Sequence, residues 1–133
     1  MNKILILVFF LLASCSKKNE LENIFTCDKN EYWSYKNNCG SYGIYFKFNS
    51  DGSHDKYLSK PIDEGKGFDL FNNDGDVISG PRTWSIKNDS IFVWDKGVYK
   101  IESCNENIII LTYYHYKEKN KKCSVALKKV LDK

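Results

Sequence analysis

The sequence of 133 residues lacks a long hydrophobic run, a strong charge bias and any familiar catalytic motif. The longest apolar segment, Ile4–Leu12, would span roughly 14 Å as a helix, about half of a bilayer's hydrocarbon core, and is too short for a permanent transmembrane helix. The net formal charge is only +3 and both signs are interspersed, which argues against a nucleic-acid-binding protein. No G-x-S-x-G or H-E-x-x-H motif occurs, so we do not expect an enzyme.

Metal-binding patterns are also missing. No two cysteines have C-x-x-C spacing, and the two histidines are remote from most of the cysteines, which disfavours a zinc site. The segment Asn72–Asp76 carries side-chain oxygens but lacks the regular alternation and the distal Glu of an EF-hand loop. The sequence therefore predicts neither a metal site nor a cofactor.

The beginning of the chain has the three-part layout of an export signal: a short region with Lys3, an apolar segment, and small residues before Cys15. Leu12-Ala13-Ser14-Cys15 resembles the lipobox of bacterial lipoproteins. That resemblance implies that residues 1–14 are a cleaved signal peptide and that Cys15 carries a diacylglyceryl group. Two or three acyl chains hold a protein essentially permanently, so we expect anchoring to a membrane.

The residues after Cys15 refine the expected location and the domain organisation. Ser16, in place of Asp, resembles the pattern that sends lipoproteins to the outer membrane, facing the periplasm or the cell surface. Residues 15–26 are mostly polar and are predicted to form the lipidated N-terminus and a flexible tether. Residues 27–133 have a suitable length for a single β-barrel-like domain.

Turn signals recur every eight to twelve residues from Glu31 onward, and the segments between them are rich in Tyr, Phe, Trp, Ile and Val. Several segments alternate, as in Tyr42–Asn49, where Ile44, Phe46 and Phe48 share one face. This pattern predicts an all-β fold, a small antiparallel meander barrel or sandwich of about eight or nine strands. The last segment, Cys123–Leu131, fits either a closing strand or a short C-terminal helix.

The second half of the chain resembles the small lipocalin-like domains found on many Gram-negative lipoproteins. Those domains have a Trp-x-Ile strand, an Asn-Asp turn, an aliphatic strand, a Tyr-x-Ile strand and a Leu-rich strand in that order. The matching residues here are Trp84-Ser85-Ile86, Asn88-Asp89, Ile91-Phe92-Val93-Trp94, Tyr99-Lys100-Ile101 and Ile108-Ile109-Ile110-Leu111. The resemblance covers about a third of the chain and implies a lipocalin-like barrel.

An even number of cysteines remains once Cys15 is assigned to the lipid, and in an exported protein this predicts two disulfides. A Cys104–Cys123 bridge is disfavoured, because the intervening strand would hold the two residues roughly 25 to 30 Å apart. The pairings left open are Cys27–Cys123 with Cys39–Cys104, or the crossed alternative. The four candidates are Cys27, Cys39, Cys104 and Cys123.

Aromatic side chains on the predicted strands are candidates for lining a ligand cavity, because ring faces pack against apolar molecules. Ordinary core or surface packing is the alternative for each of them. The candidate ligand-facing residues are Trp33, Trp84, Trp94, Tyr114 and Tyr116.

The leading functional hypothesis is a membrane-anchored envelope lipoprotein that binds a small apolar ligand or a partner protein. A barrel of about eight strands can hold one small ligand or be filled by its own side chains. The alternative is an envelope interaction, inhibitor or immunity protein without a cavity. A third class, a hydrolase, would require His54 or His115 beside a carboxylate in a cleft.

Overall fold

The computed structural model describes residues 18–71 and 82–132. The expected signal peptide, Cys15 and the segment Asn72–Asp76 lie outside these residues. Within the described part of the chain, the longest helix falls well short of what a membrane crossing requires.

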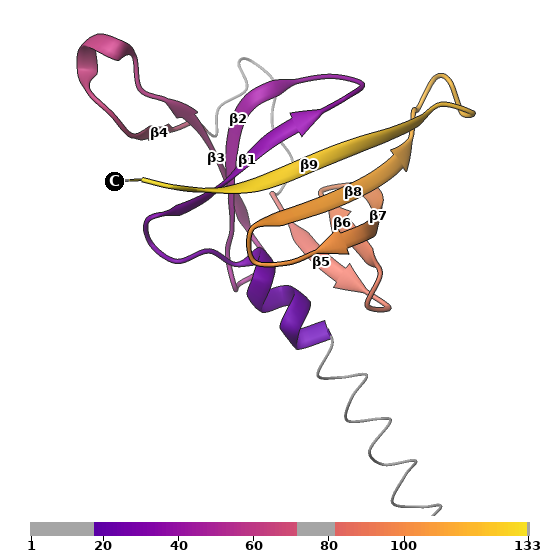
Figure 1. The fold of residues 1–133 in the computed structure, drawn as a ribbon. Helices are drawn as coiled ribbons and strands as arrows, with labels where there is room; N and C mark the ends of the chain where they lie inside the picture. Colours follow the sequence, from indigo (N-terminus) through magenta and orange to yellow (C-terminus); the bar gives the residue numbers. More distant parts are fainter. Residues whose placement is uncertain (1–17, 72–81, 133) are drawn as a thin grey trace, which may run out of the picture.

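Nine antiparallel strands form one curled sheet, a half-barrel, which confirms the all-β prediction (Figure 1). The order of the strands across the sheet is β4-β3-β2-β1-β9-β8-β7-β6-β5. The strands are β1 (Glu31–Asn37), β2 (Tyr42–Phe48), β3 (His54–Ser59), β4 (Phe68–Leu70), β5 (Trp84–Lys87), β6 (Ile91–Trp94), β7 (Gly97–Cys104), β8 (Ile108–Tyr114) and β9 (Lys122–Leu131).

The first and last long strands meet in the middle of the sheet. β1 pairs with β9 over seven residue pairs, from Glu31 opposite Leu131 to Asn37 opposite Val125. The C-terminal segment is therefore a strand, and the alternative of a terminal helix is wrong. β4 and β5 form the two edges of the sheet.

Alternating side chains explain why these segments form strands with one buried face. In β5, Trp84 and Ile86 are buried while the residues between and after them are exposed, and in β6 Phe92 and Trp94 are buried. This alternation is the one predicted from the sequence. The buried side chains gather inside the curl as a single core: Leu21, Phe25, Trp33, Phe46, Phe48, Trp84, Ile86, Phe92, Trp94, Ile109, Leu111, Val125 and Leu127.

Residues 18–25 form a helix where the sequence predicted part of a flexible tether over residues 15–26. The helix buries Leu21 and Phe25, which lie four residues apart and therefore on the same helical face. The Phe25 ring is fully buried and stacks on Phe92, with 4.5 Å between ring centroids. Burying two apolar side chains holds this segment against the barrel in spite of its polar composition.

The end of the half-barrel that receives the helix is its closed end. There the edge strand β5 meets the β2–β3 turn: the Trp84 backbone N–H donates to the Gly52 carbonyl at 3.0 Å. The Trp84 indole Nε1 donates to the Asn49 carbonyl at 2.8 Å. An isolated antiparallel bridge between Ser53 and Thr83 continues this contact. The two halves of the sheet are thus joined at this end by main-chain contacts as well as by side chains.

Among the cysteines of the described residues, one disulfide is present, between Cys39 and Cys123, with 5.7 Å between the Cα atoms. Cys39 lies in the β1–β2 turn and Cys123 at the start of β9, so the pairing of β1 with β9 brings them together. This is one bridge of the crossed alternative. The prediction of a second bridge is wrong, because Cys27 and Cys104 carry free thiols.

Between β3 and β4 the chain makes a short 3-10 helix, η1 (Ile62–Glu64). β4 then returns along β3 and places the Phe68 ring on the outer face of the sheet, 4.4 Å from the ring centroids of both Tyr32 and Tyr45. The loop between these strands projects away from the half-barrel (Figure 1).

Candidate ligand-binding cavity

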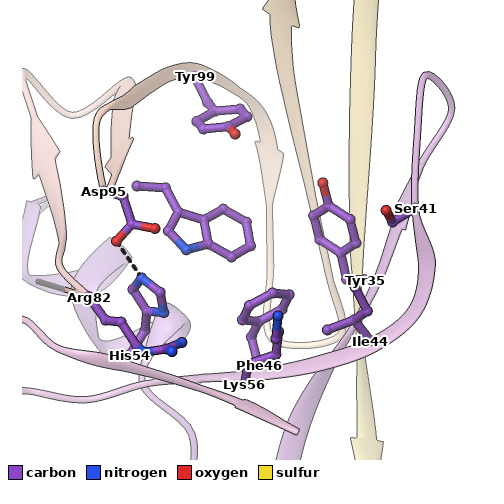
Figure 2. A pocket seen from close by; sticks show the side chains of 10 residues that line it. Tyr35, Ser41, Ile44, Phe46, His54, Lys56, Arg82, Asp95 and Tyr99 are labelled. Carbon is purple, nitrogen blue, oxygen red and sulfur yellow. Dashed lines mark hydrogen bonds and ion pairs between the residues drawn. The ribbon is translucent and has the colours of Figure 1, made fainter. Parts of the chain in front are cut away.

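An open cavity of about 260 Å³ lies inside the half-barrel, at the end away from the helix (Figure 2). We call this the open end. Its volume is near the lower limit of ligand pockets, which typically measure about 300 to 1,000 Å³. The cavity is lined by Tyr35, Ser41, Ile44, Phe46, His54, Lys56, Arg82, Trp94, Asp95 and Tyr99.

Strand alternation places most of these side chains. β2 points Ile44 and Phe46 inward, β3 does the same with His54 and Lys56, and β6 contributes Trp94. Phe46 and Trp94 belong to the core as well, so they form the boundary between packed interior and cavity. Their rings meet edge to face with 4.7 Å between centroids. The apolar part of the cavity is therefore held by rigid strands.

His54 and Asp95 form the main polar contact of the cavity. His54 Nε2 donates to Asp95 Oδ1 at 2.8 Å, and the histidine side chain is only 4% exposed. Asp95 has a φ of +53°, a conformation that Asp adopts more readily than most residues. Its carboxylate also accepts from the Thr83 N–H at 3.0 Å, and its own N–H donates to the Thr83 carbonyl at 2.8 Å. These bonds join β3 to the β6–β7 turn and the start of β5.

The second nitrogen of His54, Nδ1, is buried and has no hydrogen-bond partner among the described residues. The ring lies edge to face against Phe46, Phe48 and Trp94, with centroid distances of 6.2, 6.1 and 5.9 Å. His54 thus meets the first requirement of the hydrolase hypothesis, a carboxylate in a cavity. No described hydroxyl or thiol bonds to its ring, and the contact with Asp95 joins β3 to the β6–β7 turn.

Two tyrosine hydroxyls supply further polar groups. Burial raises the pKa of Tyr99 to about 12, with smaller contributions from the neighbouring Tyr35, Tyr113 and Asp95. Burial also raises the pKa of Tyr35, opposed by the Asn37 amide, which donates to its hydroxyl at 3.1 Å. Both phenols are therefore protonated at neutral pH and can donate hydrogen bonds.

The charged groups of the cavity are mostly cationic. Lys56 on β3 and Arg82, just before β5, bring positive charge from two sides of the cavity, and among the described lining residues Asp95 is the one acid. The Lys56 ammonium also lies 5.4 Å from the centroid of the Phe71 ring. Within residues 18–71 and 82–132, no carboxylate forms an ion pair with Arg82.

The predicted ligand-facing residues separate into three groups. Trp94 lines the cavity, whereas Trp33 and Trp84 are core residues. Tyr114 and Tyr116 are 66% and 77% exposed and point away from the core, which corrects the prediction for both. In β8, Ile109 and Leu111 are buried, so alternation directs Tyr113 inward and Tyr114 outward.

Sequence reasoning missed several lining residues, including Tyr35, Asp95 and Arg82, and named His54 only as a candidate for a hydrolase. In β2, the alternation predicted from the sequence places Ile44 and Phe46 on one face, and both side chains line the cavity. His54 and Asp95 lie 41 residues apart in the chain, and no local signal connects them. Arg82 precedes β5 and gives no pattern of its own.

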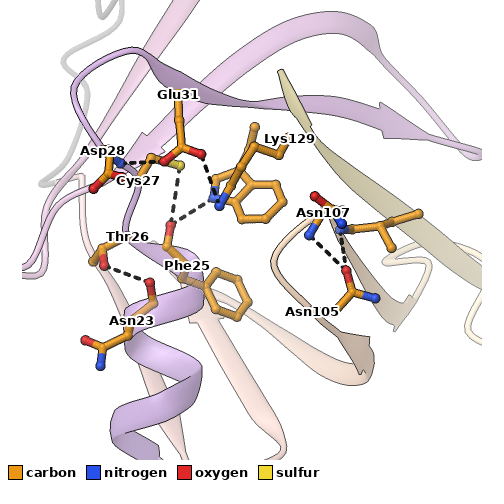
Figure 3. A network of polar contacts seen from close by, with 11 residues as sticks. Asn23, Phe25, Thr26, Cys27, Asp28, Glu31, Asn105, Asn107 and Lys129 are labelled. Carbon is orange, nitrogen blue, oxygen red and sulfur yellow. Dashed lines mark hydrogen bonds and ion pairs between the residues drawn. The ribbon is translucent and has the colours of Figure 1, made fainter. Parts of the chain in front are cut away.

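A second groove of about 550 Å³ lies between the helix and the closed end of the sheet. Figure 3 shows Glu31 and Lys129 of this groove close together, and Lys129 Nζ lies 3.6 Å from Glu31 Oε2. Nearby, the Trp33 indole donates to the Phe25 carbonyl at 2.8 Å. The indole contact fixes the end of the helix to β1, and the ion pair joins β9 to β1. The described residues contain no His, Cys, Asp and Glu group arranged to hold a metal ion.

The chain was compared with known proteins at the level of sequence and of structure. No protein-family model, curated protein or solved structure matches it. The geometry of the cavity is therefore the basis for a functional proposal.

Proposed function

We propose that this protein is a lipid-anchored bacterial envelope protein whose lipocalin-like half-barrel binds a small, mainly apolar molecule. The observation that carries the proposal is the open cavity, in which an apolar wall of Ile44, Phe46 and Trp94 meets the polar and charged side chains that make up the rest of the lining. An apolar wall with convergent polar groups is typical of small-molecule sites. The cavity opens at the end opposite the helix of residues 18–25.

Binding is tested by filling the cavity. In Ile44→Trp the larger side chain occupies the space beside Phe46, and Val98→Trp is the matched control because Val98 is 63% exposed outside the cavity. We expect titration with 1-octanol, followed by backbone NMR, to shift resonances around the cavity in the wild type and in Val98→Trp. Ile44→Trp should lose these shifts. Equal shifts in Ile44→Trp would contradict the proposal.

The anchoring part of the proposal is tested separately. Only two residues, Ser16 and Lys17, lie between Cys15 and the first described helical residue. Lipid on Cys15 would therefore hold the closed end near the membrane surface. We expect Cys15→Ser to move the protein from the membrane to the soluble fraction without changing its circular dichroism spectrum. A variant that stays with the membrane would rule out this anchor.

A partner protein is the second candidate, and exposed apolar side chains favour it. Ile62 at the start of η1 is fully exposed, and Leu70 and Phe71 at and after β4 are 60% and 42% exposed. Exposed apolar residues at a sheet edge are suited to protein contacts. We expect Ile62→Ser with Leu70→Ser to abolish capture of a partner from envelope extracts, while leaving 1-octanol binding unchanged.

A further inference from the structure

The cavity carries charged side chains, which a site for a purely apolar molecule would not need. Asp95 already accepts hydrogen bonds from His54 and from the Thr83 N–H, so two donors compensate its charge. Arg82, just before the edge strand β5, has no carboxylate partner within residues 18–71 and 82–132. An arginine guanidinium presents a planar set of donors that matches a carboxylate in a two-point contact.

The apolar and cationic parts of the cavity are adjacent. Phe46 and Trp94 form the apolar boundary with the core, and Figure 2 shows Arg82 beside His54 at the edge of the same cavity. A molecule that fills the cavity would thus place one end against rings and the other end close to the guanidinium.

We infer that the ligand is a small amphipathic carboxylate, whose anionic group pairs with Arg82 while its apolar part packs against Trp94 and Phe46. This inference rests on the proposed binding function and adds the chemical class of the ligand. The protonated hydroxyls of Tyr35 and Tyr99 are further donors to the carboxylate oxygens. The cavity volume of about 260 Å³ limits the apolar part to a short chain or a single ring system.

The experiment compares two probes that share a chain and differ in charge: octanoate and 1-octanol, titrated by calorimetry into the full-length protein. We expect octanoate to bind more tightly than 1-octanol, by about tenfold or more, because a hydrogen-bonded charge pair inside a partly buried site adds to the same apolar contact.

Substitutions of Arg82 test whether this side chain causes the difference in affinity between octanoate and 1-octanol. Arg82→Gln should weaken octanoate binding by about tenfold and leave 1-octanol binding unchanged, and Arg82→Lys should give an intermediate loss because charge is kept without the two-point contact. Lys87→Gln is the matched control: it removes one positive charge from an exposed position on the neighbouring strand β5, outside the cavity. It should leave both affinities unchanged.

The outcomes separate this inference from the proposed function. If 1-octanol binds as tightly as octanoate, or if Arg82→Gln affects neither, the cavity binds ligands but the carboxylate assignment is wrong. If Lys87→Gln weakens octanoate as much as Arg82→Gln does, general electrostatic attraction replaces a specific contact and the assignment is also wrong. If neither probe binds the wild type, both the inference and the proposed function fail.

Discussion

At the closed end of the half-barrel, the Phe25 ring of the helix fills the space between Phe48, Trp84 and Phe92, whereas the open end holds a cavity beside Trp94. Both ends are built from the same alternating strands. The two ends differ in the side chains that fill the inside of the half-barrel. The apolar face of the helix fills one end, and charged and hydroxyl-bearing side chains line the other. Stability is therefore concentrated at the closed end, and the open end keeps the space in which we propose that a ligand binds.

The strongest test of this contrast is removal of the Phe25 ring, which the helix inserts into the closed end. Phe25→Ala deletes a fully buried ring from the core and should lower the free energy of unfolding by about 3 to 5 kcal/mol, measured by urea denaturation. The corresponding truncation at the open end, Ile44→Ala, should cost about 1 kcal/mol, because the Ile44 side chain borders a cavity. Equal losses would mean that the two ends are equally packed.

The disulfide should give the next largest effect. Replacing Cys39 and Cys123 together by Ala removes a crosslink across 84 residues and should cost about 2 to 4 kcal/mol. Wild-type protein in a phosphine reductant should show a loss of similar size, and the double variant should be insensitive to the reductant. A reductant effect on the double variant would assign the loss to some other group.

The contact between His54 and Asp95 should matter less, because Asp95 is half exposed. Asp95→Asn replaces the charged acceptor by an amide and should lower the free energy of unfolding by about 1 kcal/mol. Nitrogen NMR of the His54 ring should show the hydrogen on Nε2 in the wild type. A hydrogen on Nδ1 instead would contradict the donor assignment at this contact.

The smallest expected effect on stability comes from the two free thiols. Burial raises the pKa of Cys27 and of Cys104 to about 11 each, and coulombic neighbours modify only the first. At pH 8 the thiolate fraction is thus about a hundredfold lower than for a thiol with a pKa of 9.0. In Cys15→Ser protein, a chromogenic disulfide reagent should react about a hundredfold more slowly in the native state than in guanidinium.

The same raised pKa values set the direction of alkaline destabilisation. Unfolding lowers each thiol pKa toward 9.0, so the unfolded state releases protons first as the pH rises. The contribution to stability is fully present below pH 9 and is lost as the pH rises through about 11. The melting temperature should therefore fall over this interval, and a flat profile would contradict the burial of these groups.

Much of the fold could be predicted because strands with one buried face produce a pattern that is visible in a short stretch of sequence. The segments around Phe46, Trp84 and Phe92 alternate every second residue, and turn signals separate them, so fold class and inward faces followed from the sequence. The helix was missed because only Leu21 and Phe25 carry its apolar face within a polar segment. Two residues are too few for a periodic signal to stand out.

The cavity could not be predicted for a different reason. The contact of His54 with Asp95, and the approach of β5 to the β2–β3 turn, depend on how strongly the sheet curls. Curl arises from the twist of all strands together and not from any single segment. Successive side chains of β8 point to opposite faces of the sheet. The prediction of Tyr114 in place of its neighbour Tyr113 therefore chose a side chain on the outer face.

The pairing of β1 with β9 also determines how the protein would respond to mechanical force. A pull between the N-terminal side of β1 and the C-terminal side of β9 acts at one end of this strand pair, where Glu31 lies opposite Leu131. The hydrogen bonds would break one after another, as in a zipper, until the Cys39–Cys123 bond at the far end stops the opening. The extension released from these two strands is then limited to roughly 50 to 60 Å. Strands β2 to β8, and every described lining residue of the cavity except Tyr35 of β1, lie inside the covalent loop and would carry no tension.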